Sequence, residues 1–301
     1  MTRANPYAYA VDAGRYRGAD DSWLDELDQL VVFADEPRQR MGTRAIEEAG
    51  WLCSDVHRGP ELALRRRLYD EAPGEVFDAL ADTDDPCAEA AALVHAWLAT
   101  NRPAFLADWD AKLPHPLVRA GLAVQEDLCV MQRGSEGWRL TAGMLCFPTY
   151  WRLADKIGRT LDQVHGPVPH YEDDLADKVA LFFDRLPAGR TVSRRNWGLT
   201  AHPMLFVPDL DALIQPARFD SQQLWLRSER QTLRRLPDTG AILFTIRVQL
   251  APATALLERL PLAARLLDAV EHWTPEMIAS RGNRHGWMEQ VTGWLRRIAS
   301  V

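Results

Sequence analysis

The chain has 301 residues, enough for about two domains of roughly 150 residues or for one large domain with extensions. With 47% hydrophobic and 26% charged residues, it has the composition of a folded globular protein, which excludes disordered, collagen-like and coiled-coil classes. The formal net charge of −7 argues against a general nucleic-acid binder. No stretch approaches the roughly 18 consecutive apolar residues of a membrane-spanning helix, and the start lacks an apolar signal segment, so we expect a cytoplasmic protein.

The cysteines stand far apart in the sequence and form no C-x-x-C pair. This spacing argues against a zinc ribbon and against an iron–sulfur cluster held by this chain alone. We expect buried thiols instead. The four cysteines are Cys53, Cys87, Cys129 and Cys146.

Hydrophobic spacing predicts helices over about residues 21–110, followed by two strands on either side of a polar loop. The loop, residues 133–137, has the length that closes a β-hairpin. The spacing then becomes helical from Pro148 through Val164 and again over about 172–186. Further strand-like runs follow, and residues from Pro252 onward are again helical. The five expected strands cover 125–132, 138–147, 192–200, 223–233 and 241–250.

Two strands, then helices, then three strands predict an α+β fold with an antiparallel sheet, because parallel βαβ folds alternate the two element types strictly. We divide the chain into an N-terminal helical region (1–114), a core (115–250) and C-terminal helices packed on the core (251–301). The strand order of the core is similar to that of a PAS domain, a five-stranded antiparallel sheet whose helices cover a ligand pocket.

Four long segments in this core carry a closer resemblance. Over about residues 115–250 they closely resemble the haem-dependent oxidative N-demethylase family, α-subunit type, in which a PAS-like fold holds haem b. The segments are AVQEDLCVM (123–131), LTAGMLCFPTYWRLADKIGRTLDQVHGPVPHYEDDL (140–175), SRRNWGL (193–199) and RSERQTLRRLPDTGAILFTIR (227–247).

The resemblance implies a haem-dependent oxidoreductase of the monooxygenase type. Its expected substrates are O2 and a small secondary alkylamine such as dimethylamine, from which it releases formaldehyde. Electrons would come from NADPH through FMN and a 2Fe–2S centre, with tetrahydrofolate also in the assembly. Because the chain shows no Gly-rich dinucleotide loop and no cluster of cysteines, we expect these cofactors on partner subunits, a flavin and iron–sulfur reductase and a folate-binding subunit. The alternatives are a haem-PAS gas or redox sensor without turnover and an interaction module without haem.

His165 is the candidate ligand of the haem iron. It continues an apolar stripe with Leu153, Ile157 and Leu161, so it faces inward if this segment is one helix. Gly166 follows, and the last carbonyls of a helix that ends there can accept a hydrogen bond from the imidazole Nδ1–H. The stripe by itself is equally typical of a core histidine bonded to those carbonyls. The resemblance favours His165 as the axial ligand, with His170 as the competing residue.

The run 224–233 offers a polar pocket wall. Alternation along a strand places Arg227, Glu229 and Gln231 on one face and Ser228 and Arg230 on the other. A solvated edge strand would explain the polar residues equally well. With haem beside this wall, the Glu229 carboxylate could bind an alkylammonium group, and an arginine could contact oxygen or a propionate. We therefore expect Glu229 and Arg230 as catalytic residues and Arg227 as a cofactor contact.

The SRRNW segment places Arg195 and Trp197 on one face of its strand, where they could clamp a propionate and pack against haem. A surface arginine beside a core tryptophan is the alternative interpretation. The polar residues at the start of the first strand, Gln125, Glu126 and Asp127, are expected to be structural partners rather than catalytic groups.

Overall fold

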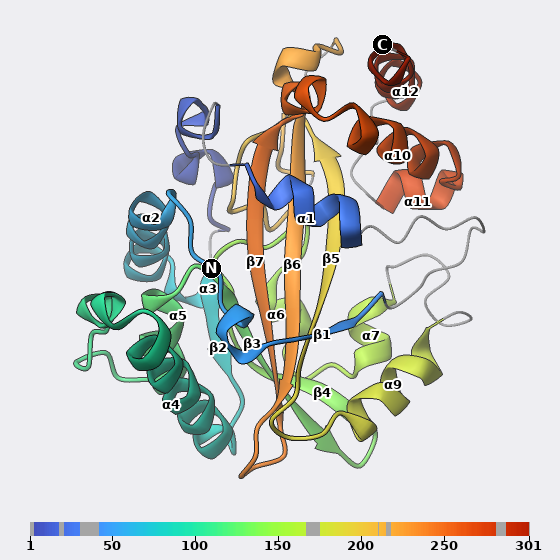
Figure 1. Ribbon diagram of the computed structural model, residues 1–301. Coiled ribbons are helices and arrows are strands. Elements are labelled where there is room, and N and C mark those ends of the chain that lie inside the picture. Colours follow the sequence, from blue (N-terminus) through green and yellow to red (C-terminus); the bar gives the residue numbers. More distant parts are fainter. Residues whose placement is uncertain are drawn as a thin grey trace.

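The structure is a computed structural model of the chain, dominated by one sheet of seven strands (Figure 1). Their order is β1-β5-β6-β7-β3-β4-β2, and every neighbouring pair is antiparallel. The antiparallel α+β fold predicted from the sequence is therefore confirmed. The described residues are 3–17, 21–30, 42–166, 175–209, 211–214, 218–280 and 287–300.

The five strands expected from the sequence are all present, but the predicted number of strands was wrong. Two further strands, each three residues long, pair at the outer edges of the sheet and come from the region expected to be helical. Three residues are too few to show alternation, which is why hydrophobic spacing missed them. The strands are β1 (Arg44–Ile46), β2 (Phe77–Ala79), β3 (Asp127–Gly134), β4 (Gly137–Met144), β5 (Thr191–Thr200), β6 (Trp225–Arg235) and β7 (Ile242–Pro252).

The single helix predicted from Pro148 to Val164 was also wrong, because the segment forms two short helices, α6 (Leu153–Lys156) and α7 (Leu161–His165). Gly158 lies between them with φ of +79°, a conformation that ends a helix. The β4 edge pairs there with the segment, since Gly158 N donates to Leu140 O at 2.7 Å. Long-range strand pairing thus overrides the local helical pattern.

The N-terminal helices lie where the spacing predicts them, and β1, β2 and Trp51 of this region join the same sheet and core as the later strands. The division into regions 1–114, 115–250 and 251–301 stays a prediction. The α-helices before β3 are α1 (Trp23–Leu30), α2 (Arg58–Glu71), α3 (Pro73–Val76), α4 (Asp84–Asn101) and α5 (Pro116–Ala123). The later ones, besides α6 and α7, are α9 (Ala176–Arg185), α10 (Leu260–Glu271), α11 (Pro275–Ser280) and α12 (Met288–Ala299). The 3-10 turns are η1 (Pro6–Tyr9), η2 (Ala13–Tyr16), η3 (Glu48–Gly50), η4 (Pro103–Asp108), η5 (Ser221–Gln223) and η6 (Ala253–Glu258).

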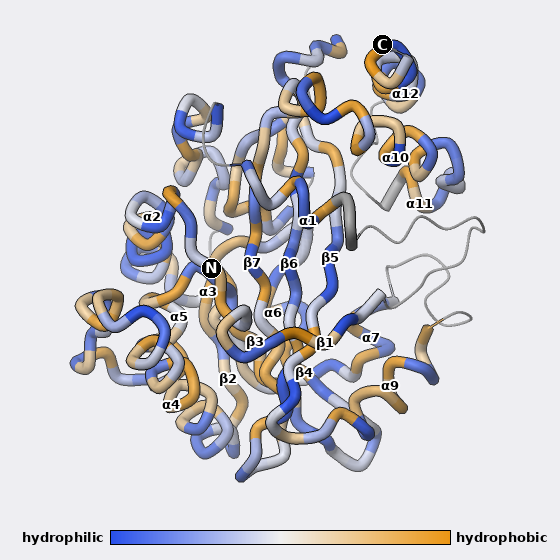
Figure 2. The backbone as a smooth tube through the Cα atoms, in the orientation of Figure 1, coloured by the Kyte–Doolittle hydropathy of each residue, from blue (hydrophilic) through white to orange (hydrophobic). Residues whose placement is uncertain are grey.

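The strand register defines two faces of the sheet. The front face, on which α1 crosses β5, β6 and β7 in Figure 1, carries Arg195, Arg230 and Arg247 side by side on these three strands. The rear face carries Arg194 beside Gln231, and Asn196 beside Glu229. Hydrophilic segments run through the middle of β5 and β6 in Figure 2, in contrast to the apolar interior of most sheets. The two faces therefore need different partners for their polar side chains.

The three front-face arginines are buried and meet acceptors from the N-terminal part of the chain. Arg195 pairs with Glu26 of α1 at 2.7 Å, and Arg247 pairs with Asp55 at 2.6 Å and with Glu61 of α2 at 2.9 Å. The Arg230 guanidinium instead donates to the backbone carbonyls of Gly50 and Trp51. These contacts hold residues 50–61 and α1 against the front face.

A fully buried ion pair joins α2 to the beginning of β3. The Arg65 guanidinium lies 2.8 Å from an Asp127 carboxylate oxygen, and both side chains are 0% exposed. Arg65 also donates to the carbonyls of Gly121 and Glu126, both at 2.8 Å. Asp127 accepts the backbone N–H groups of Cys146 at 2.7 Å and of Phe147 at 3.0 Å, so it fixes the chain just after β4.

We expect Asp127→Asn to lower the free energy of unfolding by about 3–5 kcal/mol, because it leaves the buried Arg65 charge without its counter-ion. Chemical denaturation of the purified chain measures this loss. Asp110→Asn is the matched control, since Asp110 pairs with Arg66 at 3.3 Å on the surface and its loss should cost no more than about 1 kcal/mol. Equal losses in the two variants would contradict this role of Asp127.

Candidate functional site

The rear face of β5 and β6 carries a group of polar residues that reach solvent. Asn196 is exposed, and Arg194, Glu229 and Gln231 are partly exposed. Their neighbours on the front face, including Arg195 and Arg230, are buried. Central strands are normally covered on both faces, so accessible polar side chains here mark the rear face as the surface of a candidate site.

Glu229 is the acidic residue of this group, and its carboxylate is held by two hydrogen bonds. One carboxylate oxygen accepts the Thr149 hydroxyl at 2.5 Å, and the other accepts the Gln231 side-chain amide at 2.8 Å. A carboxylate offers about four lone-pair positions, so lone pairs remain for a further donor. The carboxylate is thus held in place without being saturated.

Arg227 lies on the same face of β6 as Glu229, two residues before it, and its side chain is buried. Its Nε donates to the Thr149 hydroxyl at 2.8 Å, and its two terminal nitrogens donate to backbone carbonyls of two separate segments. Burial lowers the pKa of Arg227, an effect that the nearby Glu229 charge opposes. The guanidinium stays charged, since arginine begins from a pKa above 12. The carbonyls belong to Met204, Leu205, Phe147 and Pro148, at distances of 2.7 to 3.1 Å.

His165 ends α7 and its Nδ1 lies 2.9 Å from the carbonyl oxygen of Leu161, the contact that the sequence predicts. A carbonyl can only accept, so Nδ1 carries the hydrogen and Nε2 carries the lone pair of the neutral ring. Burial lowers the pKa of His165 to about 4, and the positive charges of Lys156 and Arg194 act in the same direction. The imidazole is therefore neutral at pH 7, the form that can bind a metal ion.

Lys156 of α6 forms a hydrogen bond to the end of α7. Its Nζ donates to the carbonyl of Val164 at 2.6 Å and lies 5.2 Å from the centre of the Trp151 ring. Burial lowers the pKa of this amine, whereas the charges of Asp155 and Glu229 raise it. The Lys156 charge acts on the pKa of His165, and the Glu229 charge acts on the pKa of Lys156, so Lys156 lies within electrostatic range of both residues.

The remaining predicted site residues lie on the front face. Arg195 donates to Glu26 and to Gln249, and Arg230 bonds the carbonyls of residues 50 and 51. Trp197 packs against Trp273, with ring centroids 5.2 Å apart, in the core formed with α1, α10 and α12. Strand alternation therefore places these three residues on the face opposite to Glu229 and Arg227. His170 lies outside the described residues.

The polar residues at the start of β3 make structural contacts, as expected from the sequence. Gln125 donates to Asp55 and Glu61, Glu126 accepts the backbone N–H of Cys53, and Asp127 binds Arg65. Three of the four cysteines are buried and Cys53 is partly buried. Burial raises the pKa of Cys87 and of Cys146 to about 12, which keeps both as inert thiols.

Three residues of this neighbourhood were not foreseen from the sequence: Thr149, Lys156 and Arg194. Thr149 and Lys156 lie in a segment expected to form one helix, so their approach to Glu229 and His165 could not be read from spacing. Arg194 and Arg195 point to opposite faces of the strand, and alternation alone does not tell which of these arginines lies on the rear face. The sequence offered one signal for Lys156, because it is one of only three lysines in the chain.

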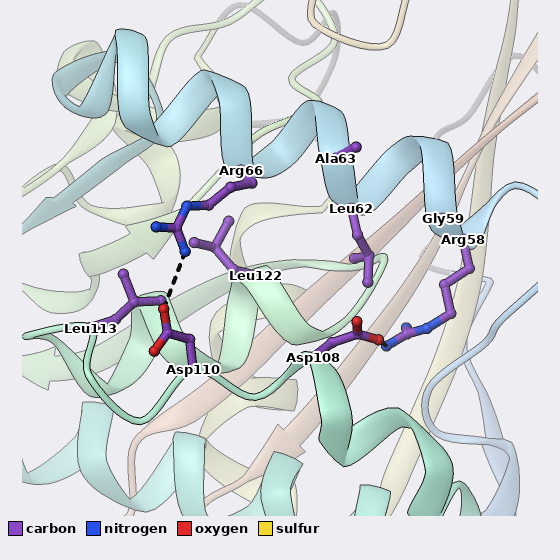
Figure 3. Close-up of a pocket in the computed structure, with 9 residues that line it drawn as sticks. All are labelled: Arg58, Gly59, Leu62, Ala63, Arg66, Asp108, Asp110, Leu113 and Leu122. Carbon is purple, nitrogen blue, oxygen red and sulfur yellow. Dashed lines mark hydrogen bonds and ion pairs between the residues drawn. The ribbon is translucent and has the colours of Figure 1, made fainter.

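A separate hollow lies between α2 and the segment from η4 to α5 (Figure 3). Its rim is formed by two ion pairs, Arg58 with Asp108 at 2.7 Å and Arg66 with Asp110 at 3.3 Å, and its floor by leucines. These charges neutralise one another, and no predicted site residue lines the hollow. It therefore contributes nothing to the rear-face site.

Within the described ranges, no group of three or more histidine, cysteine, aspartate or glutamate side chains could hold a metal ion. Among the described helices, none is long and apolar enough to cross a membrane. A family model described as haem-dependent oxidative N-demethylase, alpha subunit-like, matches residues 42–292, which include every element of the rear-face site.

Proposed function

Since the chain belongs to the haem-dependent oxidative N-demethylase, alpha subunit-like family, we propose that it binds haem b on the rear face and oxidatively demethylates a small secondary amine. The observation that carries the proposal is a neutral, anchored imidazole and an oriented, accessible carboxylate that both lie within electrostatic range of Lys156. The pairing of a sheet with helices over one face is in keeping with a PAS-like haem pocket.

The residues present fit haem as the cofactor. His165 supplies a neutral imidazole whose Nδ1–H is already bonded to a carbonyl, as histidine ligands of metals require. Lys156 and Arg194 supply the positive charge that haem propionates need, and Trp151 and Val164 supply apolar surface. We propose His165 as the axial ligand, with Lys156 keeping its helix in position.

Bound haem would supply the oxidation of the amine by O2, and the protein supplies binding and orientation. Glu229 would hold the protonated amine through a charge-assisted hydrogen bond. The overall conversion takes one dimethylamine, one O2, two electrons and two protons to methylamine, formaldehyde and water. Arg195, Trp197 and Arg230 stand on the other face and are not part of the site that we propose.

The two electrons must come from outside this chain. The alpha-subunit description of the family implies further subunits. We propose that a flavin and iron–sulfur reductase delivers electrons from NADPH through FMN and a 2Fe–2S centre, and that a folate-binding subunit takes up the formaldehyde with tetrahydrofolate. The sequence offers neither a Gly-rich dinucleotide loop nor paired cysteines for these cofactors.

The direct test is an assay of the haem-loaded chain with dimethylamine and O2. We expect a Soret band, formaldehyde formation when a reducing partner is added, and no sustained turnover with NADPH alone. Haem binding without amine-dependent turnover would favour the gas or redox sensor. Absence of a Soret band after reconstitution would contradict both functions, and NADPH-driven turnover by the chain alone would contradict the multi-subunit assembly.

His165→Ala should abolish or strongly reduce haem retention while the fold survives, because a partly exposed side chain at a helix end can be removed without leaving a large cavity. Absorbance at the Soret band per mole of protein measures retention, and circular dichroism reports the fold. His170→Ala is the comparison. Normal retention in the His165 variant together with loss in the His170 variant would move the ligand by five residues.

Glu229→Gln should weaken amine binding by about ten- to a hundredfold, since the variant loses a charge-assisted hydrogen bond of about 1.5–3 kcal/mol. Amine titration followed through the haem spectrum measures the affinity, and haem content should stay unchanged. Glu48→Gln on the other face, where Glu48 pairs with Arg234 at 2.6 Å, is the matched control. An unchanged affinity in Glu229→Gln would place this carboxylate outside the amine site.

A further inference from the structure

We propose that Thr149 is a positioning residue of the amine site. Its hydroxyl accepts an N–H from Arg227 and directs its own proton to Glu229, which holds that carboxylate as an acceptor facing the substrate. The inference rests on the proposed function, because it explains how Glu229 is presented to an ammonium group.

The direction of each hydrogen bond follows from the chemistry of the groups. A guanidinium can only donate, so the Thr149 oxygen must accept from Arg227 Nε at 2.8 Å. The hydroxyl has a single hydrogen, which is left for the Glu229 oxygen at 2.5 Å. Arg227 therefore sets the rotation of the hydroxyl, and the hydroxyl sets the position of the carboxylate.

The Thr149 backbone is itself held in place. Tyr150 N donates to Val207 O at 2.7 Å, and Val207 N donates to Pro148 O at 3.3 Å, so the segment pairs with the one that follows β5. Arg227 bonds carbonyls of both segments. A hydroxyl on such a fixed backbone loses little further conformational entropy when it orients a partner.

The second Glu229 oxygen is fixed by the Gln231 amide at 2.8 Å. Each oxygen thus accepts one neutral donor and keeps a lone pair. The Arg227 guanidinium donates to Thr149 and to four backbone carbonyls rather than to this carboxylate. Two oriented oxygens suit a secondary ammonium, which carries two N–H donors.

The experiment compares Thr149→Val, which keeps the shape but removes the hydroxyl, with Thr149→Ser, which restores the hydroxyl. Calorimetric titration of the haem-loaded chain with dimethylammonium chloride gives the affinity, and KM and kcat are measured with the reducing partner. We expect Thr149→Val to raise Kd and KM about tenfold with kcat within about twofold, and Thr149→Ser to lie within about threefold of the parent.

Thr245→Val is the control for loss of a buried hydroxyl, since Thr245 bonds Thr232 at 2.6 Å on the opposite face, and it should bind amine like the parent. If Thr149→Val does not fold, Thr149→Cys, whose thiol is a weaker partner, gives the same comparison. Parent-like affinity in Thr149→Val, or equal impairment in Thr149→Ser, would overturn the inference alone. A parent chain that binds no dimethylammonium would instead overturn the proposed function.

Discussion

The buried pair of Arg65 and Asp127 is the contact on which the rest of the site depends. Asp127 receives its charge partner from α2 and uses its remaining lone pairs on the backbone just after β4. The carbonyls of that same segment accept hydrogen bonds from Arg227, and Arg227 also donates to the Thr149 hydroxyl. A helix of the N-terminal region and a carboxylate on the rear face are thereby joined through one continuous set of bonds.

The two faces of β5, β6 and β7 have different roles. On the front face, arginines stand next to one another on β5, β6 and β7, and their mutual repulsion is offset by Glu26, Asp55 and Glu61 from the N-terminal part. On the rear face, the polar side chains of Arg194, Asn196, Glu229 and Gln231 on β5 and β6 reach solvent. Alternation of side chains along a strand makes this division possible, because neighbouring residues face opposite sides. Stability and the proposed chemistry thus do not compete for the same side chains.

How much the sequence predicts depends on the range of the interaction concerned. The five long strands and the partition of 224–233 into two faces follow from a period of two, a local property. The bond from His165 to Leu161 is also local, between a helix end and its last turn. The break at Gly158 depends on pairing with β4, and the partner of Arg195 lies 169 residues away in α1. Such contacts leave no periodic signal, so the sequence could not predict that Arg195 pairs with Glu26.

The hydrogen bonds of Arg227 limit which residues can replace it. Its guanidinium meets five acceptors from two segments: Nε donates to one hydroxyl, one terminal nitrogen donates to one carbonyl, and the other terminal nitrogen donates to three carbonyls. Lysine, with three donors on a single atom, would leave part of this set unsatisfied in a buried place, although the net charge would be the same. Keeping both segments over β6 therefore requires arginine at this position, and a residue of equal charge does not suffice.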